Sequence, residues 1–275
     1  MNTIKPDLFM DGLSMASFNI LAPQFSQNNA FPQVNSDDLD WDTRLDGIIK
    51  AILQMGSSII CLQEATFQTC SQILERLNND PNPSYKIISE INPSTPHGVA
   101  TIYNSYRKEV VKNSRYKSTS RIQYIDITID DATVTMVNCH LKANKENEEI
   151  RREQINGILA AEPAIIIGDF NSFPDGSVIA ALRAHRYKEY RDYTNYSIDS
   201  PYSFTTMKYR GNPIELYKAV SDYIFYRLPG WIVYELRKMP REHEFPTGMP
   251  SPTCPSDHLM LYGEFRKLRV EIYNW

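Results

Sequence analysis

The stretch that decides the fold is Ile165–Pro174, which reads IIIGDFNSFP. Three consecutive isoleucines are typical of a strand buried on both faces, because β-branched side chains suit a strand and neither face is polar. The run stops at Gly168, and Asp169 and Asn171 follow. A buried strand that delivers an acid and an amide at its end can present both groups to a phosphate.

Short apolar runs recur on both sides of this strand and alternate with segments of helical pattern, which predicts a mixed α/β sandwich. Further strands are expected at residues 13–20, 58–63, 99–103, 122–129, 134–139, 219–226 and 259–265. Helices are expected at 41–55, 66–78, 144–160 and 175–185, with Asp42 or Thr43 capping the first. Long polar loops at 21–40, 191–215 and 238–256 exceed what a compact core needs, and such loops often hold substrate.

The composition is that of an ordinary globular protein. Of 275 residues, 42% are hydrophobic and 23% are charged, so we expect one domain over residues 1–275. A net charge of −4 argues against binding nucleic acid by bulk charge, although a locally basic groove is compatible with it. Four cysteines without a CxxC pair, no signal peptide and no membrane-length apolar segment predict an intracellular protein, cytoplasmic or nuclear, with no membrane partner.

Polar residues gather at the edges of the predicted strands. Taken alone, each has an ordinary explanation: Glu64 can cap the next helix, and Asp169 and Asn171 can form an Asx turn. Taken together they indicate a catalytic site, because carboxylates suit Mg²⁺ or Mn²⁺ while histidines and amides can hold phosphate oxygens. The set comprises Asn19, Glu64, His140, Asp169, Asn171, Asp222, Asp257 and His258.

Six short motifs occur in the order found in the endonuclease/exonuclease/phosphatase superfamily. They are SFNIL at 17–21, CLQE at 61–64, NCHLKA at 138–143, GDFNSFP at 168–174, SDYIFY at 221–226 and PSDHLML at 255–261. The chain resembles this superfamily, which implies a DNase I-like four-layer α/β sandwich of two central mixed β-sheets flanked by helices. In detail it resembles the branch of carbon-catabolite-repressor-type deadenylases, nocturnin and Angel proteins.

The resemblance implies which residues hold a metal ion. Glu64 corresponds to the principal ligand of Mg²⁺ or Mn²⁺, and Asp257 lies on the metal side. Asn19 would contact a metal-bound water or the phosphate. Asp169 would orient or deprotonate the attacking water, or hold a second cation.

The same resemblance gives roles to the remaining residues. Asn171 would hydrogen-bond the scissile phosphate, and His140 would donate to a phosphate oxygen. Asp222 would fix the orientation and charge of His258, since a carboxylate partner favours the imidazolium. The implied reaction is metal-assisted hydrolysis of a phosphoester by in-line attack of water.

The substrate depends on residues outside the strands. Tyr217 stands five residues before Asp222, where the deadenylases resemble one another in carrying an aromatic residue that stacks on a base. Nocturnin carries a basic residue there, so Tyr217 favours RNA, although a tyrosine that only fills a loop would give the same pattern. Lys142, Lys208 and Arg210 match family positions near the substrate and could bind phosphates, or be isolated surface charges.

We therefore expect a Mg²⁺-dependent 3′-to-5′ exoribonuclease that acts on single-stranded, A-rich 3′ ends and releases 5′-nucleotides. One alternative is a nocturnin-like phosphatase acting on NADP(H) or another small nucleotide-like phosphoester; another is a catalytically silent binding module. The chain departs from the deadenylases at His97–Gly98, where they carry Asp–Gly. It has no leucine-rich repeats, so the resemblance implies no contact with a scaffold. Lys145, Arg151 and Arg152 are predicted to form a solvated helix face.

Overall fold

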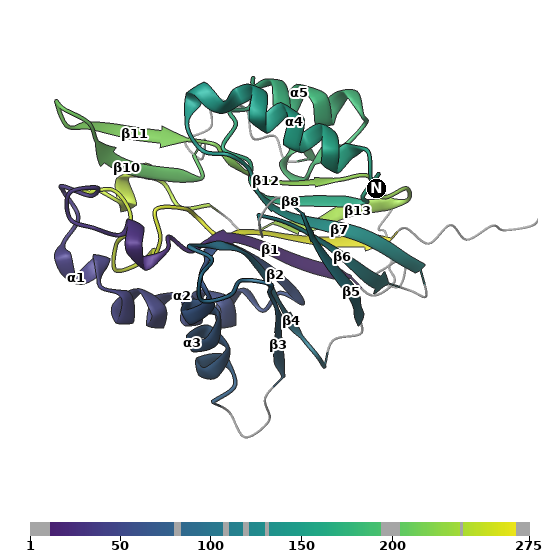
Figure 1. Ribbon diagram of the computed structural model, residues 1–275, viewed down its shortest axis with the longest axis horizontal. Coiled ribbons are helices and arrows are strands. Elements are labelled where there is room, and N and C mark those ends of the chain that lie inside the picture. Colours follow the sequence, from purple (N-terminus) through teal and green to yellow (C-terminus); the bar gives the residue numbers. More distant parts are fainter. Residues whose placement is uncertain are drawn as a thin grey trace, which may run out of the picture.

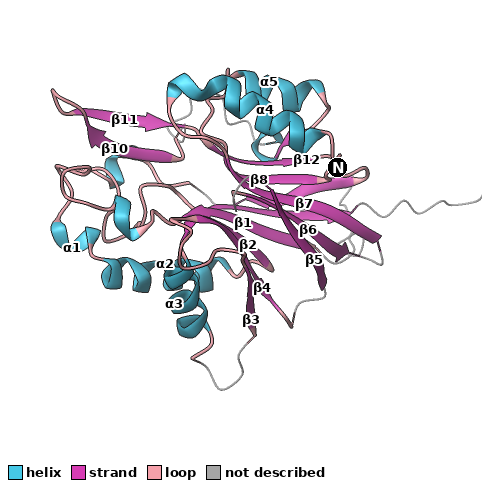
Figure 2. Cartoon of the chain, in the orientation of Figure 1, coloured by secondary structure: helices cyan, strands magenta, loops and turns pink. Residues whose placement is uncertain are grey.

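The computed structural model describes residues 12–79, 84–106, 110–117, 121–129, 132–193, 204–236 and 239–267. This part of the chain forms two six-stranded mixed sheets that pack face to face, with helices on both outer faces (Figure 1, Figure 2). The predicted four-layer α/β sandwich is confirmed.

The first sheet joins the two ends of the described chain. Its spatial order is β13 (Trp231–Leu236), β14 (Leu261–Lys267), β1 (Leu13–Asn19), β2 (Ile59–Ala65), β4 (Gly98–Asn104) and β3 (Tyr85–Ile88). Strands β1 and β2 run parallel, and β14 is antiparallel to β1.

The second sheet comes from the middle of the chain. Its spatial order is β5 (Val110–Lys117), β6 (Ile122–Ile129), β7 (Ala132–His140), β8 (Ile165–Asp169), β12 (Asp222–Tyr226) and β9 (Lys188–Glu189). Only β7 and β8 are parallel among its paired strands in the described ranges. Strands β6 and β7 pair as the predicted hairpin, whose expected turn at Asp130–Asp131 lies outside the described residues.

Two helical layers cover the sheets (Figure 2). The helices are α1 (Ser36–Leu39), α2 (Trp41–Met55), α3 (Phe67–Leu77), α4 (Glu148–Leu159) and α5 (Ser177–Ala184). Helices α2 and α3 pack on the first sheet, and α4 and α5 pack on the second. Short 3₁₀ helices lie at Pro23–Phe25, Lys145–Asn147, Tyr190–Tyr193 and Glu242–Glu244.

The three isoleucines of β8 show why the strand is apolar throughout. Ile165 and Ile167 enter the core between the two sheets, whereas Ile166 faces the core under α4 and α5. Both faces of the strand are therefore buried, as the sequence predicts.

Several details differ from the sequence-based expectation. The N-cap of α2 is Asp40, whose side chain accepts from Thr43 N, rather than Asp42 or Thr43. The expected loop 191–215 contains β10 (Thr206–Arg210), which pairs with β11 (Glu215–Ala219). Ala219 therefore ends β11, and the strand expected at 219–226 begins only at Asp222. The residues of this hairpin are mostly polar, and the pattern hides its strands.

Arg151 does not belong to a solvated face. It is buried, and its guanidinium donates to the carbonyl of Lys142 and to Glu148. Arg152 and Lys145 are exposed as expected. No helix within the described ranges is long and apolar enough to cross a membrane.

Candidate active site

Three of the predicted residues form one row across the second sheet. His140 on β7 stands opposite Asp169 on β8, which in turn stands opposite Asp222 on β12. Residues directly opposite each other project from the same sheet face. This is the face that carries Ile165 and Ile167, so the row points towards the first sheet and not towards α4 and α5. All three polar side chains are buried.

Gly168 sets how closely this row can pack. Its φ of +143° is rarely adopted by L-residues, and a Cβ built there would lie 1.9 Å from the carbonyl oxygen of Cys139. Beyond the strand, Asn171 N donates to Asp169 Oδ1 at 2.9 Å, which is the Asx turn. The turn leaves Asp169 Oδ2 directed into the site, so the structural and catalytic interpretations of Asp169 are compatible.

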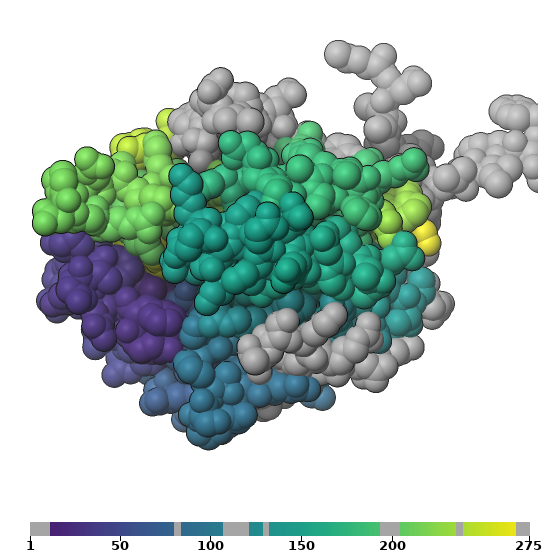
Figure 3. Space-filling view, turned by 45° about the horizontal axis from the view of Figure 1, so that its top comes forward, coloured from purple at the N-terminus to yellow at the C-terminus, as the bar shows by residue number. Residues whose placement is uncertain are grey.

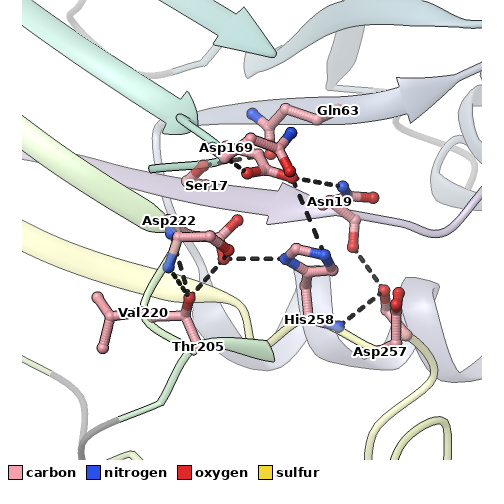
Figure 4. Close-up of polar contacts among 12 residues, drawn as sticks. Ser17, Asn19, Gln63, Asp169, Thr205, Val220, Asp222, Asp257 and His258 are labelled. Atoms are coloured by element: carbon pink, nitrogen blue, oxygen red, sulfur yellow. Dashed lines mark hydrogen bonds and ion pairs between the residues drawn. The ribbon is translucent and has the colours of Figure 1, made fainter. Parts of the chain in front are cut away.

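His258 enters from the loop that precedes β14. Its Nδ1 lies 2.9 Å from Asp222 Oδ2, and its Nε2 lies 3.9 Å from Asp169 Oδ2 (Figure 4). Ser256 fixes the loop, because its Oγ donates to the Asn19 carbonyl at 2.6 Å and accepts from His258 N. Thr205 Oγ1 donates to the same Asp222 oxygen at 2.6 Å. The imidazole is therefore held in one orientation.

The surroundings raise the pKa of both Asp169 and His258, which leaves the two groups with different charges. Burial, followed by the charge of Asp222, raises the pKa of Asp169 to about 7. Burial opposes the charged form of His258, but the carboxylates of Asp222 and Asp257 outweigh it and raise its pKa to about 10. Burial and the nearby charge of Arg121 lower the pKa of His140 well below its ordinary value. Near neutral pH the site thus holds a carboxylate able to accept a proton, one imidazolium and one neutral imidazole.

The first sheet contributes Asn19 and Glu64. Glu64 has a φ of +56° and lies where the β2–β4 register shifts, a distortion that can re-aim a side chain. Asn19 Nδ2 lies 3.3 Å from Glu64 Oε1 and 3.1 Å from Asp169 Oδ2, so this amide joins the two sheets. The N-cap of α3 is Thr66, not Glu64, which leaves the Glu64 carboxylate for the site.

Asp257 is close enough to Glu64 for its charge to act on the Glu64 carboxylate. Burial and the charge of Asp257 raise the pKa of Glu64. One oxygen of Asp257 binds Lys208 Nζ, while the other, Oδ1, is buried with no hydrogen-bond partner in the described part of the chain. An unpaired carboxylate oxygen next to a second carboxylate fits a divalent cation, which prefers such hard ligands.

A second group of possible ligands is less suited to a cation. One oxygen each of Asp169 and Asp222 and a ring nitrogen of His258 lie within 4.8 Å of one another. The raised pKa of His258 keeps the ring protonated near neutral pH, and an imidazolium has no lone pair to offer. The carboxylates of Glu64 and Asp257 therefore fit a metal ion better, while Asn19 Nδ2 donates a hydrogen bond to Glu64.

The β10–β11 hairpin carries three of the four predicted substrate residues. Lys208 stands opposite Tyr217, and the Arg210 guanidinium lies 3.5 Å from the centre of the Tyr217 ring. Lys208 Nζ also lies 5.5 Å from the centre of the Phe31 ring, and the hairpin adjoins the segment after β1 on the molecular surface (Figure 3). Lys142, the fourth residue, is exposed, and its ammonium has no bonded partner among the residues that the structure describes.

Other residues of the site did not stand out in the sequence. Arg121 stands opposite His140 and binds His97, while Thr205 and Ser256 hold Asp222 and the His258 loop. Arg44 donates to the carbonyls of Ile20, Leu21 and Pro255. Arg121 immediately precedes the antiparallel strand β6, as Asp222 begins β12, and a position at the start of an apolar strand run is the signal that would have found it.

The chain belongs to the Endonuclease/Exonuclease/phosphatase family, whose profile matches residues 16–258. Members of this family are hydrolases that act on phosphoester bonds, and they generally depend on a divalent metal ion.

Particular relatives support the resemblance to the nocturnin, Angel and deadenylase branch. Nocturnin of Xenopus laevis is 26% identical over 276 residues, covering 90% of this chain and 71% of that protein. The CCR4-Not complex 3'-5'-exoribonuclease subunit Ccr4 of Candida albicans is 22% identical over 331 residues, covering 93% of this chain but 41% of that protein. The structure of ANGEL2, a 2',3'-cyclic phosphatase, in complex with adenosine-2',3'-vanadate has the same fold, with a TM-score of 0.75, 17% identity and coverage of 93% and 96%.

Proposed function

We propose that the chain is a Mg²⁺-dependent 3′-to-5′ exoribonuclease that acts on A-rich single-stranded 3′ ends and releases nucleoside 5′-monophosphates. The observation that carries the proposal is the Lys208–Asp257 ion pair, which ties the hairpin bearing Tyr217 to the loop that carries Asp257 and His258. An aromatic ring beside a phosphoester site offers a platform on which a base can stack. The similarity to an exoribonuclease subunit supports this choice of substrate.

The side chains of the row divide the chemistry. Asp169, with a pKa of about 7, accepts a proton from the water that attacks phosphorus as the bond to the 3′ oxygen breaks. His258, held by Asp222, presents a protonated Nε2 to a phosphate oxygen, and His140 approaches the same centre, 3.6 Å from Asp169 Oδ2. Both histidines then stabilise the negative charge that builds on the phosphate.

Glu64 and Asp257 would hold the Mg²⁺ ion, and Asn19 would contact a metal-bound water or the phosphate. When bound, the ion would neutralise charge on phosphate oxygens as a Lewis acid. The chain's own contribution is to hold the Glu64 carboxylate in place, because Ala22 N and Asn19 Nδ2 both donate to it.

Purified protein incubated with end-labelled, A-tailed RNA and Mg²⁺ tests the proposal, with chromatography of the released nucleotides. We expect stepwise shortening from the 3′ end, and a loss of about 10³-fold or more in Glu64→Gln and Asp169→Asn. The matched controls are the exposed Glu90→Gln and Asp175→Asn, which should retain activity. Full activity in Glu64→Gln or Asp169→Asn would overturn these roles.

A phosphatase acting on a nucleotide such as NADP(H) is the second candidate. The observation in its favour is that the Arg210 guanidinium lies over the Tyr217 ring. A group that can bind phosphate thus covers one face of the ring on which a base would stack. NADP and a 2′,3′-cyclic nucleotide offered beside A-tailed RNA separate the candidates. Phosphate release from NADP with intact RNA would replace the exoribonuclease assignment.

A further inference from the structure

Arg121 is a fourth member of the row across the second sheet. The β6–β7 ladder pairs Ile122 with Cys139, and the next hydrogen bond runs from His140 N to Arg121 O at 2.9 Å. Arg121 therefore stands opposite His140 and projects from the same sheet face. Ile122 and Cys139 both enter the core under the helices, which places Arg121 on the opposite face, with His140 and Asp169.

His97 holds the Arg121 side chain. A guanidinium nitrogen of Arg121 lies 2.9 Å from His97 Nε2, and the His97 ring lies 5.8 Å from the His140 ring, centre to centre. The edge of Phe25 packs on His97 with 5.0 Å between ring centres. Burial and the charge of Arg121 lower the pKa of His97 to about 4, so a neutral imidazole accepts the hydrogen bond.

The guanidinium keeps its positive charge and has no carboxylate within ion-pair distance among the described residues. Two other arginines with low exposure pair with carboxylates: Arg151 binds Glu148, and Arg191 binds Glu189. Arg44 is buried and donates to three carbonyls, with only its Nε lacking a partner in the described structure. A partly buried guanidinium whose side-chain partner among the described residues is a neutral ring has donors left for an anion.

Two ring nitrogens near Arg121 also lack hydrogen bonds. The Nδ1 atoms of His97 and His140 are both buried without a hydrogen bond in the described structure. Burial lowers the pKa of Arg121, and the negative charge of Glu64 partly offsets this lowering. The charge of Arg121 therefore acts on two residues of the candidate site, His140 on its own sheet and Glu64 on the other.

We propose that Arg121 binds a non-bridging oxygen of the scissile phosphate, with His97 as its positioning residue. The inference rests on the proposed function only in requiring a phosphoester substrate. A guanidinium offers paired N–H donors that match phosphate oxygens, and at this position it adds positive charge where the His140–Asp169 row meets the phosphate. His97 stands just before β4, at the position where the resemblance expects an acid, so the chain has a neutral acceptor there for Arg121.

Arg121→Ala tests the assignment against A-tailed RNA and against bis(4-nitrophenyl) phosphate, a diester without a base. We expect kcat to fall by about 10²- to 10³-fold on both substrates. Added guanidinium ion should restore part of the lost rate, whereas methylammonium should not. His97→Gln, which keeps a hydrogen-bond acceptor, should retain more activity than His97→Leu. The exposed Arg152→Ala is the control and should behave as the unaltered protein.

Activity near that of the unaltered protein in Arg121→Ala would overturn the proposal. A loss that guanidinium does not restore, together with a lower melting temperature, would also overturn it, because Arg121 would then be structural. If the protein cleaves the diester but not RNA, the exoribonuclease assignment fails and Arg121 is still tested. If it cleaves neither, titration with inorganic phosphate by calorimetry decides: weaker binding in Arg121→Ala supports the proposal, and equal binding refutes it.

Discussion

The candidate site has two walls, the row of His140, Asp169 and Asp222 and the β10–β11 hairpin, and they are built differently. The row of His140, Asp169 and Asp222 lies on neighbouring strands in the middle of a six-stranded sheet, where ladder hydrogen bonds fix every position. The β10–β11 hairpin is a separate two-stranded ribbon at one end of the molecule, beside the loop that follows β1 (Figure 1). Its Lys208 reaches Asp257, whereas Tyr217 and Arg210 stack on each other.

This difference separates chemistry from substrate choice. A packed sheet holds reacting groups within narrow limits, as hydrolysis requires. The base of the β10–β11 ribbon is held at Thr206 and Met207 beside His258 and Asp257, whereas Arg210 and Tyr217 lie further along it and outside both six-stranded sheets, so these two side chains can change without disturbing the row. Substitutions in the row should therefore affect kcat and stability, and substitutions in the hairpin should affect substrate binding.

Among the substitutions that test this comparison, the largest change in rate is expected from Asp222→Asn. Asp169 must be ionised and His258 protonated, so the rate should rise as pH passes about 7 and fall as pH passes about 10. Removing the Asp222 charge lowers both pKa values, which moves both limbs of the profile to lower pH. The rate at about pH 8 should drop by about 10²-fold.

A pH–rate profile at saturating metal ion measures this shift. Asp46→Asn is the control, since Asp46 is exposed and pairs with Arg76. Unmoved limbs in Asp222→Asn would show that Asp222 does not govern the charge of His258.

A smaller effect is expected from one glycine in each wall. Gly168→Ala places a methyl group against the Cys139 carbonyl, and the free energy of unfolding should fall by about 3 kcal/mol or more. Gly211, in the hairpin turn, also has a positive φ, but its nearest obstacle is 3.2 Å away, so Gly211→Ala should cost about 1–2 kcal/mol. Urea unfolding measures both, and equal losses would contradict the contrast between the walls.

The smallest effect is expected from Tyr217→Ala. Losing one stacked base should raise KM for A-tailed RNA by about 5- to 100-fold and leave kcat nearly unchanged. Tyr217→Phe keeps the ring and serves as the control. Steady-state kinetics on RNA and on bis(4-nitrophenyl) phosphate give the comparison. A matching rise in KM for the baseless diester would show that Tyr217 does not act by stacking.

The sequence predicts the row of His140, Asp169 and Asp222 better than it predicts the β10–β11 hairpin. Asp169, His140 and Asp222 flank apolar strand runs, and a strand buried on one or both faces leaves a plain pattern. Arg121 was missed because it follows polar residues and lies just before its strand, and its position opposite His140 appears only once β6 pairs with β7. The hairpin strands were missed because each has only five residues and mixes charged residues with apolar ones, and the burial of Arg151 depends on the fold of the Lys142–Lys145 segment.

Strand β14 has a consequence for how the molecule is assembled. It pairs with β1, although about 240 residues of chain separate them, whereas the strands of the second sheet lie between residues 110 and 226. During synthesis the second sheet can form first, while β1 waits for its antiparallel neighbour until late. Asp257 and His258 immediately precede β14, so they reach Asp222 only as that last strand docks. A nascent chain would therefore gain its structure in two stages and its chemistry in the second.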